Sequence, residues 1–84
     1  SPNPFNPKTT FKYFLHEKSL VSITIFDAMG RVVNNLFYGI QYPGFNSASW
    51  VSTNNLGHKV PSGIYFCQIQ TGGTTKTNKI MLLK

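Results

Sequence analysis

Short runs of alternating apolar and polar residues, divided by turn-forming residues, are the feature that most constrains this chain. The runs at 9–15, 20–26 and 63–71 place apolar side chains at every second position, which is the period of a strand with one buried face. Turn signals recur roughly every 8–12 residues, and no run has a convincing helical period. We therefore predict an all-β fold, a sandwich or small barrel of six or seven strands.

The predicted core lies on the inward faces of these runs. Trp50 is its natural centre, since one indole can fill the gap between two sheets. The alternative role for Trp50 is a sugar-stacking platform, but its place on the same strand face as Ala48 favours the core. The other predicted core residues are Val21, Ile23, Ile25, Val33, Leu36, Tyr65, Cys67 and Ile69.

Three segments between the runs have turn chemistry. Asp27 and Gly30 suit the first and fourth positions of a type I turn, and Gly72-Gly73 suits a two-residue hairpin in which both glycines can take positive φ. Residues 39–44 are predicted to form a loop, and 52–62 is the longest turn-rich stretch. In 32–38 the apolar residues are three apart, which indicates a bulge or an edge strand.

The chain length of 84 residues allows one modest core. Residues 1–8, which hold three of the five prolines, are predicted to be the end of a linker leading into the first strand. Residues 9–84 are predicted to be a single domain. No apolar run is long enough for a transmembrane segment, and no signal peptide opens the sequence, so an exported protein would carry its signal upstream.

The net charge of +6 raises the question of anionic partners. Its eight lysines and arginines are spread along the whole chain without any run. This spacing favours solubility and general attraction to anionic surfaces over a specific site. We therefore expect no nucleic-acid partner.

The inventory of reactive side chains argues against an enzyme. Glu17 and Asp27 are the sole carboxylate side chains, and both look like turn residues. Cys67 has no second cysteine and sits in an apolar run, while His16 and His58 lie in separate turn-like segments. No recognised catalytic, phosphate-binding or metal-binding motif is present. We expect no catalytic residues, no metal and no cofactor.

The remaining routes to function are surface routes. Four aromatic residues occupy polar-side or loop positions and form a possible interaction surface: Phe14, Phe26, Tyr42 and Phe66. Several exposed aromatics together would mark a binding patch. The sheet edges offer a second route, through backbone pairing with a partner strand.

An ordered set of motifs along the chain resembles a known family. It opens with Pro2-Asn3-Pro4-Phe5-Asn6-Pro7 and continues with Ile25-Phe26-Asp27, Gly30-Arg31, Val33 and Leu36. Trp50 follows, then Gly57, Val60 and Ser62-Gly63-Ile64-Tyr65-Phe66, and finally Lys79, Leu82, Leu83 and Lys84. The pattern is similar to the C-terminal sorting domains of the type IX secretion system, and equally to the immunoglobulin-like domain of the flagellar hook-capping protein.

The resemblance implies an immunoglobulin-like β-sandwich of about seven antiparallel strands. It implies a non-catalytic module of a larger precursor, secreted or at the cell surface, whose partner is the secretion machinery at the outer membrane. The family's sorting signal corresponds here to Lys79, Ile80, Met81, Leu82, Leu83 and Lys84. Deleting this segment is expected to retain the cargo while leaving the fold largely intact.

Two positions depart from the family pattern. Val51 stands where an aspartate often follows the tryptophan, and His16 where a proline is usual. A cation-binding role for residues 52–60 is therefore doubtful. The alternative function is a surface binding or assembly module, which would bind polysaccharide or self-associate through exposed aromatics and strand edges.

Overall fold

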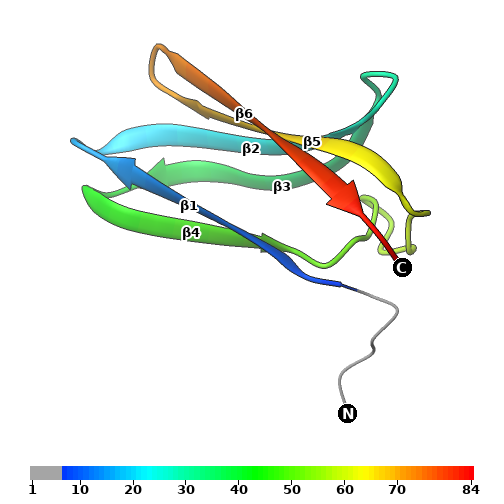
Figure 1. The fold of residues 1–84 in the computed structure, drawn as a ribbon. Coiled ribbons are helices and arrows are strands. Elements are labelled where there is room, and N and C mark those ends of the chain that lie inside the picture. Colours follow the sequence, from blue (N-terminus) through cyan, green and yellow to red (C-terminus); the bar gives the residue numbers. More distant parts are fainter. Residues whose placement is uncertain (1–6) are drawn as a thin grey trace.

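The computed structural model describes residues 7–84, which form six antiparallel strands and no helix (Figure 1). The strands are β1 (Thr9–Leu15), β2 (Ser19–Asp27), β3 (Val32–Gln41), β4 (Gly44–Trp50), β5 (Gly63–Thr71) and β6 (Thr74–Leu82). The predicted all-β class is confirmed. The described residues hold six strands where the family resemblance led us to expect about seven. Most of the predicted linker, residues 1–6 of 1–8, lies outside the described part.

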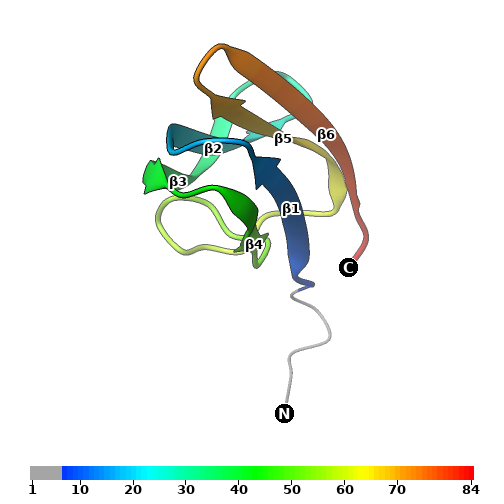
Figure 2. The same ribbon diagram turned by 90° about the vertical axis from the view of Figure 1, so that its left-hand side faces the viewer.

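The strands form two layers of unequal width, which Figure 2 shows from the side. Four of them make one sheet in the order β3-β2-β5-β6, and the other two make the sheet β1-β4. The short turn from β3 to β4 passes from the wide sheet to the narrow one and joins the layers on that side. The narrow sheet therefore faces a sheet with twice as many strands.

Trp50 lies at the centre of the core and is fully buried. Its ring centroid is 5.3 Å from that of Tyr65, and its indole N–H donates a 2.7 Å hydrogen bond to the Thr53 carbonyl. The indole thus buries its apolar body and still satisfies its one donor. The buried apolar residues around it are Phe11, Leu15, Val21, Ile23, Ile25, Val60, Tyr65, Cys67, Ile69, Ile80 and Leu82.

Two residues of the predicted core, Val33 and Leu36, are partly exposed and pack against its margin. They belong to β3, which is the edge strand of the wide sheet. The pairing of β2 with β3 shifts register twice, between Ile23 and Thr24 and between Ile25 and Phe26. Such shifts break the strict alternation of inward and outward side chains, which explains why apolar residues three apart share this strand.

The turns follow the predicted chemistry with two corrections. The Asp27 carboxylate accepts hydrogen bonds from the backbone N–H groups of Met29 and Arg31, each 2.9 Å long, and Gly30 takes a φ of 82°. At the second glycine turn, Gly72 alone takes a positive φ. The predicted loop at 39–44 is too long, because β3 continues to Gln41 and β4 begins at Gly44.

Residues 51–62 form an ordered loop rather than a seventh strand. The Asn54 side-chain oxygen accepts 3.0 Å hydrogen bonds from the N–H groups of Leu56 and His58. The Asn55 side chain accepts from the N–H of Asn35 on β3, at 2.8 Å. The asparagine side chains thus accept hydrogen bonds from backbone N–H groups of the loop and of β3. These N–H groups therefore have partners without pairing to a further strand.

Candidate functional site

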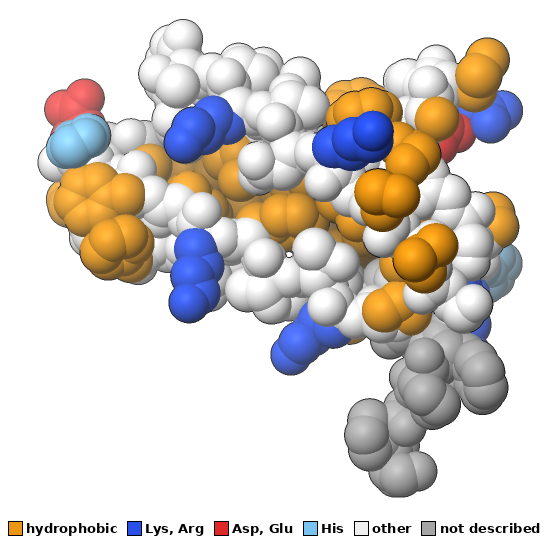
Figure 3. All heavy atoms as spheres, viewed as in Figure 1, with side chains coloured by type: hydrophobic (Ala, Val, Ile, Leu, Met, Phe, Trp, Pro, Cys, Tyr) orange, Lys and Arg blue, Asp and Glu red, His pale blue; other side chains and the backbone are white. Residues whose placement is uncertain are grey.

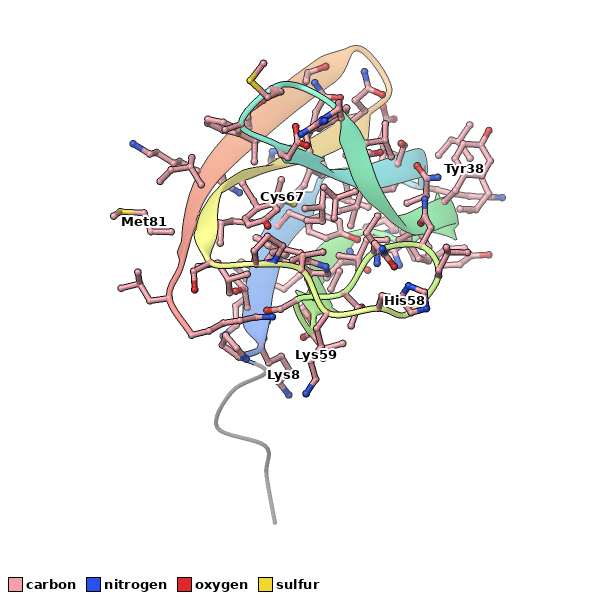
Figure 4. The ribbon with its side chains drawn as sticks, turned by 90° about the vertical axis from the view of Figure 1, so that its right-hand side faces the viewer. Lys8, Tyr38, His58, Lys59, Cys67 and Met81 are labelled. Carbon is pink, nitrogen blue, oxygen red and sulfur yellow. The ribbon has the colours of Figure 1, made fainter. Side chains whose placement is uncertain are left out.

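The segment predicted to carry the sorting signal alternates between the core and the surface. Ile80 and Leu82 point inward and are 7% and 2% exposed, whereas Met81 and Leu83 are 67% and 79% exposed. Lys79 and Lys84 are exposed as well. Figure 4 shows Met81 directed away from the body, with Cys67 lying between the layers. The alternation follows from the pleat of β6, in which neighbouring side chains take opposite faces.

The outward residues of β6 lie beside apolar residues of the neighbouring strands. Met81 is the cross-strand partner of Ile64, and Lys79 is the partner of Phe66. Cross-strand partners on one face have Cβ atoms about 5 Å apart, so their side chains touch. Phe66 in turn lies opposite Phe26 of β2.

These residues form one continuous surface on the outer face of the wide sheet, which we call the β6 patch. Its members are Phe26, Val32, Ile64, Phe66, Lys79 and Met81. Val32 and Met81 are exposed, and the two phenylalanines are half-buried. Apolar side chains gather around the C-terminal end of β6 in Figure 3. The patch unites two predicted interaction residues with two residues of the predicted signal.

The other two predicted interaction residues lie elsewhere. Phe14 is on β1 opposite Phe45 of β4, and their ring centroids are 5.0 Å apart in an edge-to-face arrangement. Tyr42 is in the β3–β4 turn, where the Lys18 Nζ lies 5.9 Å from its ring centroid. The four predicted aromatics therefore occupy two separate surfaces rather than one.

Phe45 is the most exposed aromatic of the described residues, at 84%, and it is absent from the sequence-based prediction. Its run, 45–51, alternates weakly, but Phe45 is five residues before Trp50 and so takes the opposite strand face, which was the available signal. Its contact with Phe14 could not be predicted, because the register that brings the two rings together joins residues 31 positions apart.

The side chains that could react chemically are either buried or far apart. Cys67 is fully buried, and this burial raises the pKa of its thiol to about 11, which disfavours the nucleophilic thiolate. His16 follows the end of β1, whereas His58 lies in the loop after β4, near the other end of the sandwich. Among residues 7–84, no three histidine, cysteine or acidic side chains come together as a metal site would require. None of these residues forms a helix suited to crossing a bilayer.

The fold and its surface define a class of two-layer β modules whose outer face, rather than a cleft, is the candidate contact site. A model of the family described as the secretion system C-terminal sorting domain matches residues 2–83, and the chain belongs to this family. The family is a C-terminal signal on proteins exported by type IX secretion to the cell surface or beyond. The predicted localisation, secreted or at the cell surface, is confirmed.

A solved structure supports the second resemblance. The chain is similar to the crystal structure of FlgD from P. aeruginosa, with 26% sequence identity and a TM-score of 0.72. The match covers 95% of this chain and 64% of that protein's chain. Both families are non-catalytic. A search of curated proteins finds no match.

Proposed function

We propose that this chain is a non-catalytic module that directs a larger exported protein through the type IX pathway to the cell surface. Its partner is the secretion machinery at the outer membrane, which contacts the β6 patch together with Leu83. The observation that carries the proposal is the alternation of Lys79–Lys84 between core and surface. A partner that binds the folded domain can reach Lys79, Met81, Leu83 and Lys84, whereas Ile80 and Leu82 fix their position.

Deleting Lys79–Lys84 is an ambiguous test of this proposal. The deletion removes two buried side chains, Ile80 and Leu82, and the pairing of β6 with Gly63–Phe66. We expect such a chain to lose stability, contrary to the sequence-based expectation that the fold would stay largely intact. Loss of export would then report unfolding as readily as loss of a signal. Substitutions confined to the outward side chains separate the two causes.

The experiment is secretion of a reporter fused to this chain in a bacterium with a type IX system. We expect Met81→Ser with Leu83→Ser to lower the secreted fraction about ten-fold, with unchanged thermal unfolding of the purified domain. The matched control is Leu20→Ser with Ile40→Ser. These two residues are partners on the outer face of the same sheet, 47% and 48% exposed, on the strands away from β6. Normal export of the Met81 and Leu83 variant would refute the proposed contact.

A second candidate function rests on the aromatic residues at the other end of the sandwich. Phe14, Phe45 and Tyr42 are 49%, 84% and 64% exposed, an unusual display for a domain of this size. Flat exposed rings can stack against sugar rings, so this end is suited to binding a surface polysaccharide. Calorimetric titration with cell-surface polysaccharide tests it: Phe45→Ser should abolish binding, and Leu20→Ser should not. Equal affinity of both variants would exclude this role.

A further inference from the structure

The sandwich is closed on one side and open on the other. The β3–β4 turn joins the layers on the closed side, and those two strands approach each other. On the other side, β1 and β6 are the outer strands of their sheets, and within residues 7–84 each pairs with a single strand. A groove of about 670 Å³ lies between them. Figure 3 shows this hollow beside β6, with apolar side chains at its floor.

The residues that line the groove show how each strand faces it. From β1 the groove is lined by consecutive residues, Lys12 to Leu15, so the edge of this strand borders it. From β6 the lining residues are Thr74, Lys76 and Asn78, which are alternate positions on one face. The groove is therefore bordered by the edge of one sheet and roofed by the inner face of the other.

The inner face of β6 is uncovered along this groove. Residues 74–79 are exposed on both faces of the strand, whereas alternate residues of β5 are buried. Lys76 is the cross-strand partner of the buried Ile69, so it occupies an inward position. The narrow sheet does not reach this part of the wide sheet. One further strand beside β1 would cover it.

The charges at the groove identify the chemistry of a suitable strand. Lys12 and Lys76 line it, and Glu17 is the one carboxylate among its lining residues. A second copy of this chain is a poor occupant, because each copy carries a net charge of +6 and two carboxylate side chains. The two lysines attract negative charge, so the groove favours a segment with several carboxylates and few cationic side chains.

We propose that the groove binds an extended acidic segment of a partner protein, which pairs with the free edge of β1 and becomes a third strand of the β1–β4 sheet. Alternate backbone groups on an edge strand point outward without partners, and an added strand satisfies them. Carboxylates on its inward face lie against Lys76, whose side chain the narrow sheet leaves exposed. This site is separate from the β6 patch and does not depend on its role in export.

The test uses the whole 84-residue chain. The probe is a capped peptide of alternating valine and glutamate, about seven residues long to match a strand. We expect saturable binding by calorimetry that weakens as salt rises, and slower amide hydrogen exchange in Lys12–Leu15. The same peptide with lysine in place of glutamate should not bind. A peptide N-methylated at alternate residues should also fail, because it cannot donate its share of the ladder hydrogen bonds.

Variants locate the site. Lys76→Glu should weaken binding about ten-fold by turning attraction into repulsion. Lys59→Glu makes the same charge change in the loop after β4, outside the groove, and should leave affinity within about two-fold. Equal effects of the two substitutions would overturn the proposal, as would protection confined to β3 or β4. A dimer of the chain alone that the peptide does not dissociate would assign the groove to a second copy and also overturn it.

Discussion

Ile80 lies directly opposite Tyr65 in the pairing of β5 with β6, and both side chains are buried. We predict that Ile80→Ala lowers the free energy of unfolding by about 2 to 5 kcal/mol, because it leaves a cavity against the core. Met81→Ala, on the exposed face of the same strand, should change it by less than about 0.5 kcal/mol. Urea unfolding followed by Trp50 fluorescence measures both. Equal destabilisation by the two substitutions would show that β6 does not hold this register.

Ser52 joins the start of the described chain to the loop after β4. It is fully buried, and its Oγ donates a 2.6 Å hydrogen bond to the Pro7 carbonyl. Its backbone has a φ of 63°, in the left-handed region. We predict that Ser52→Ala costs about 1 to 3 kcal/mol through the lost hydrogen bond.

Ser52→Gly is the matched control for that prediction. It loses the same hydrogen bond but accepts the positive φ, so it should be more stable than Ser52→Ala by roughly 1 kcal/mol. Thermal unfolding of the two variants and the parent chain measures the order. An alanine variant as stable as the glycine variant would show that the backbone relaxes away from the left-handed conformation.

The carboxylate of Asp27 links the stability of the β2–β3 turn to pH. The backbone N–H of Arg31 donates to this carboxylate and holds the pKa of Asp27 below its usual value, with further help from the Arg31 side chain 2.8 Å away. Because the pKa of Asp27 is lower in the folded chain, its carboxylate stabilises the fold fully when the pH is above the usual aspartate pKa, near 3.9. This stabilisation is lost as the pH falls through the pKa of Asp27 in the folded chain.

We therefore predict that Asp27→Asn is less stable than the parent chain at neutral pH and that the difference shrinks on acidification below about pH 4. Thermal unfolding of both chains from pH 7 downward tests this. Both chains keep Glu17, so the difference between them isolates Asp27. A constant gap between the two melting curves at every pH would contradict the prediction.

Alternation predicted the face of each side chain but not its neighbour in space. The pattern in β2 and β5 correctly placed Ile23 and Ile69 in the core, and the Asp27 turn follows from local chemistry alone. Phe26 and Phe66 were both predicted to point outward, yet only the β2–β5 register brings them together. That register depends on how whole strands pack, which no local pattern encodes.

The division of the strands into a sheet of four and a sheet of two also could not be predicted from the sequence. Polar residues of β6 such as Lys76 and Asn78 are compatible with a solvent-facing strand in either sheet. Their inward positions follow from the pairing with Ile69 and Cys67. The open groove is a consequence of that partition. A sequence-based search for exposed apolar residues therefore finds Phe26 and Phe66, two members of the β6 patch, but not the groove.

Cys67 provides a probe of how closely the two layers pack. Its thiol is fully buried and has a pKa of about 11, so at pH 8 about one native molecule in a thousand would carry the thiolate. We predict that a thiol reagent labels the native chain at least about a hundred-fold more slowly than the chain in urea, with labelling limited by opening of the fold. Because burial raises the pKa of the Cys67 thiol, its contribution to stability is complete below the pKa of the unfolded chain, near 8.5. That contribution is lost as the pH rises towards 11.

Ile80→Ala should speed labelling of Cys67 in the native chain in proportion to its loss of stability, whereas Met81→Ala should not. Fast labelling of the native chain would mean that the groove between β1 and β6 admits the reagent as far as the core.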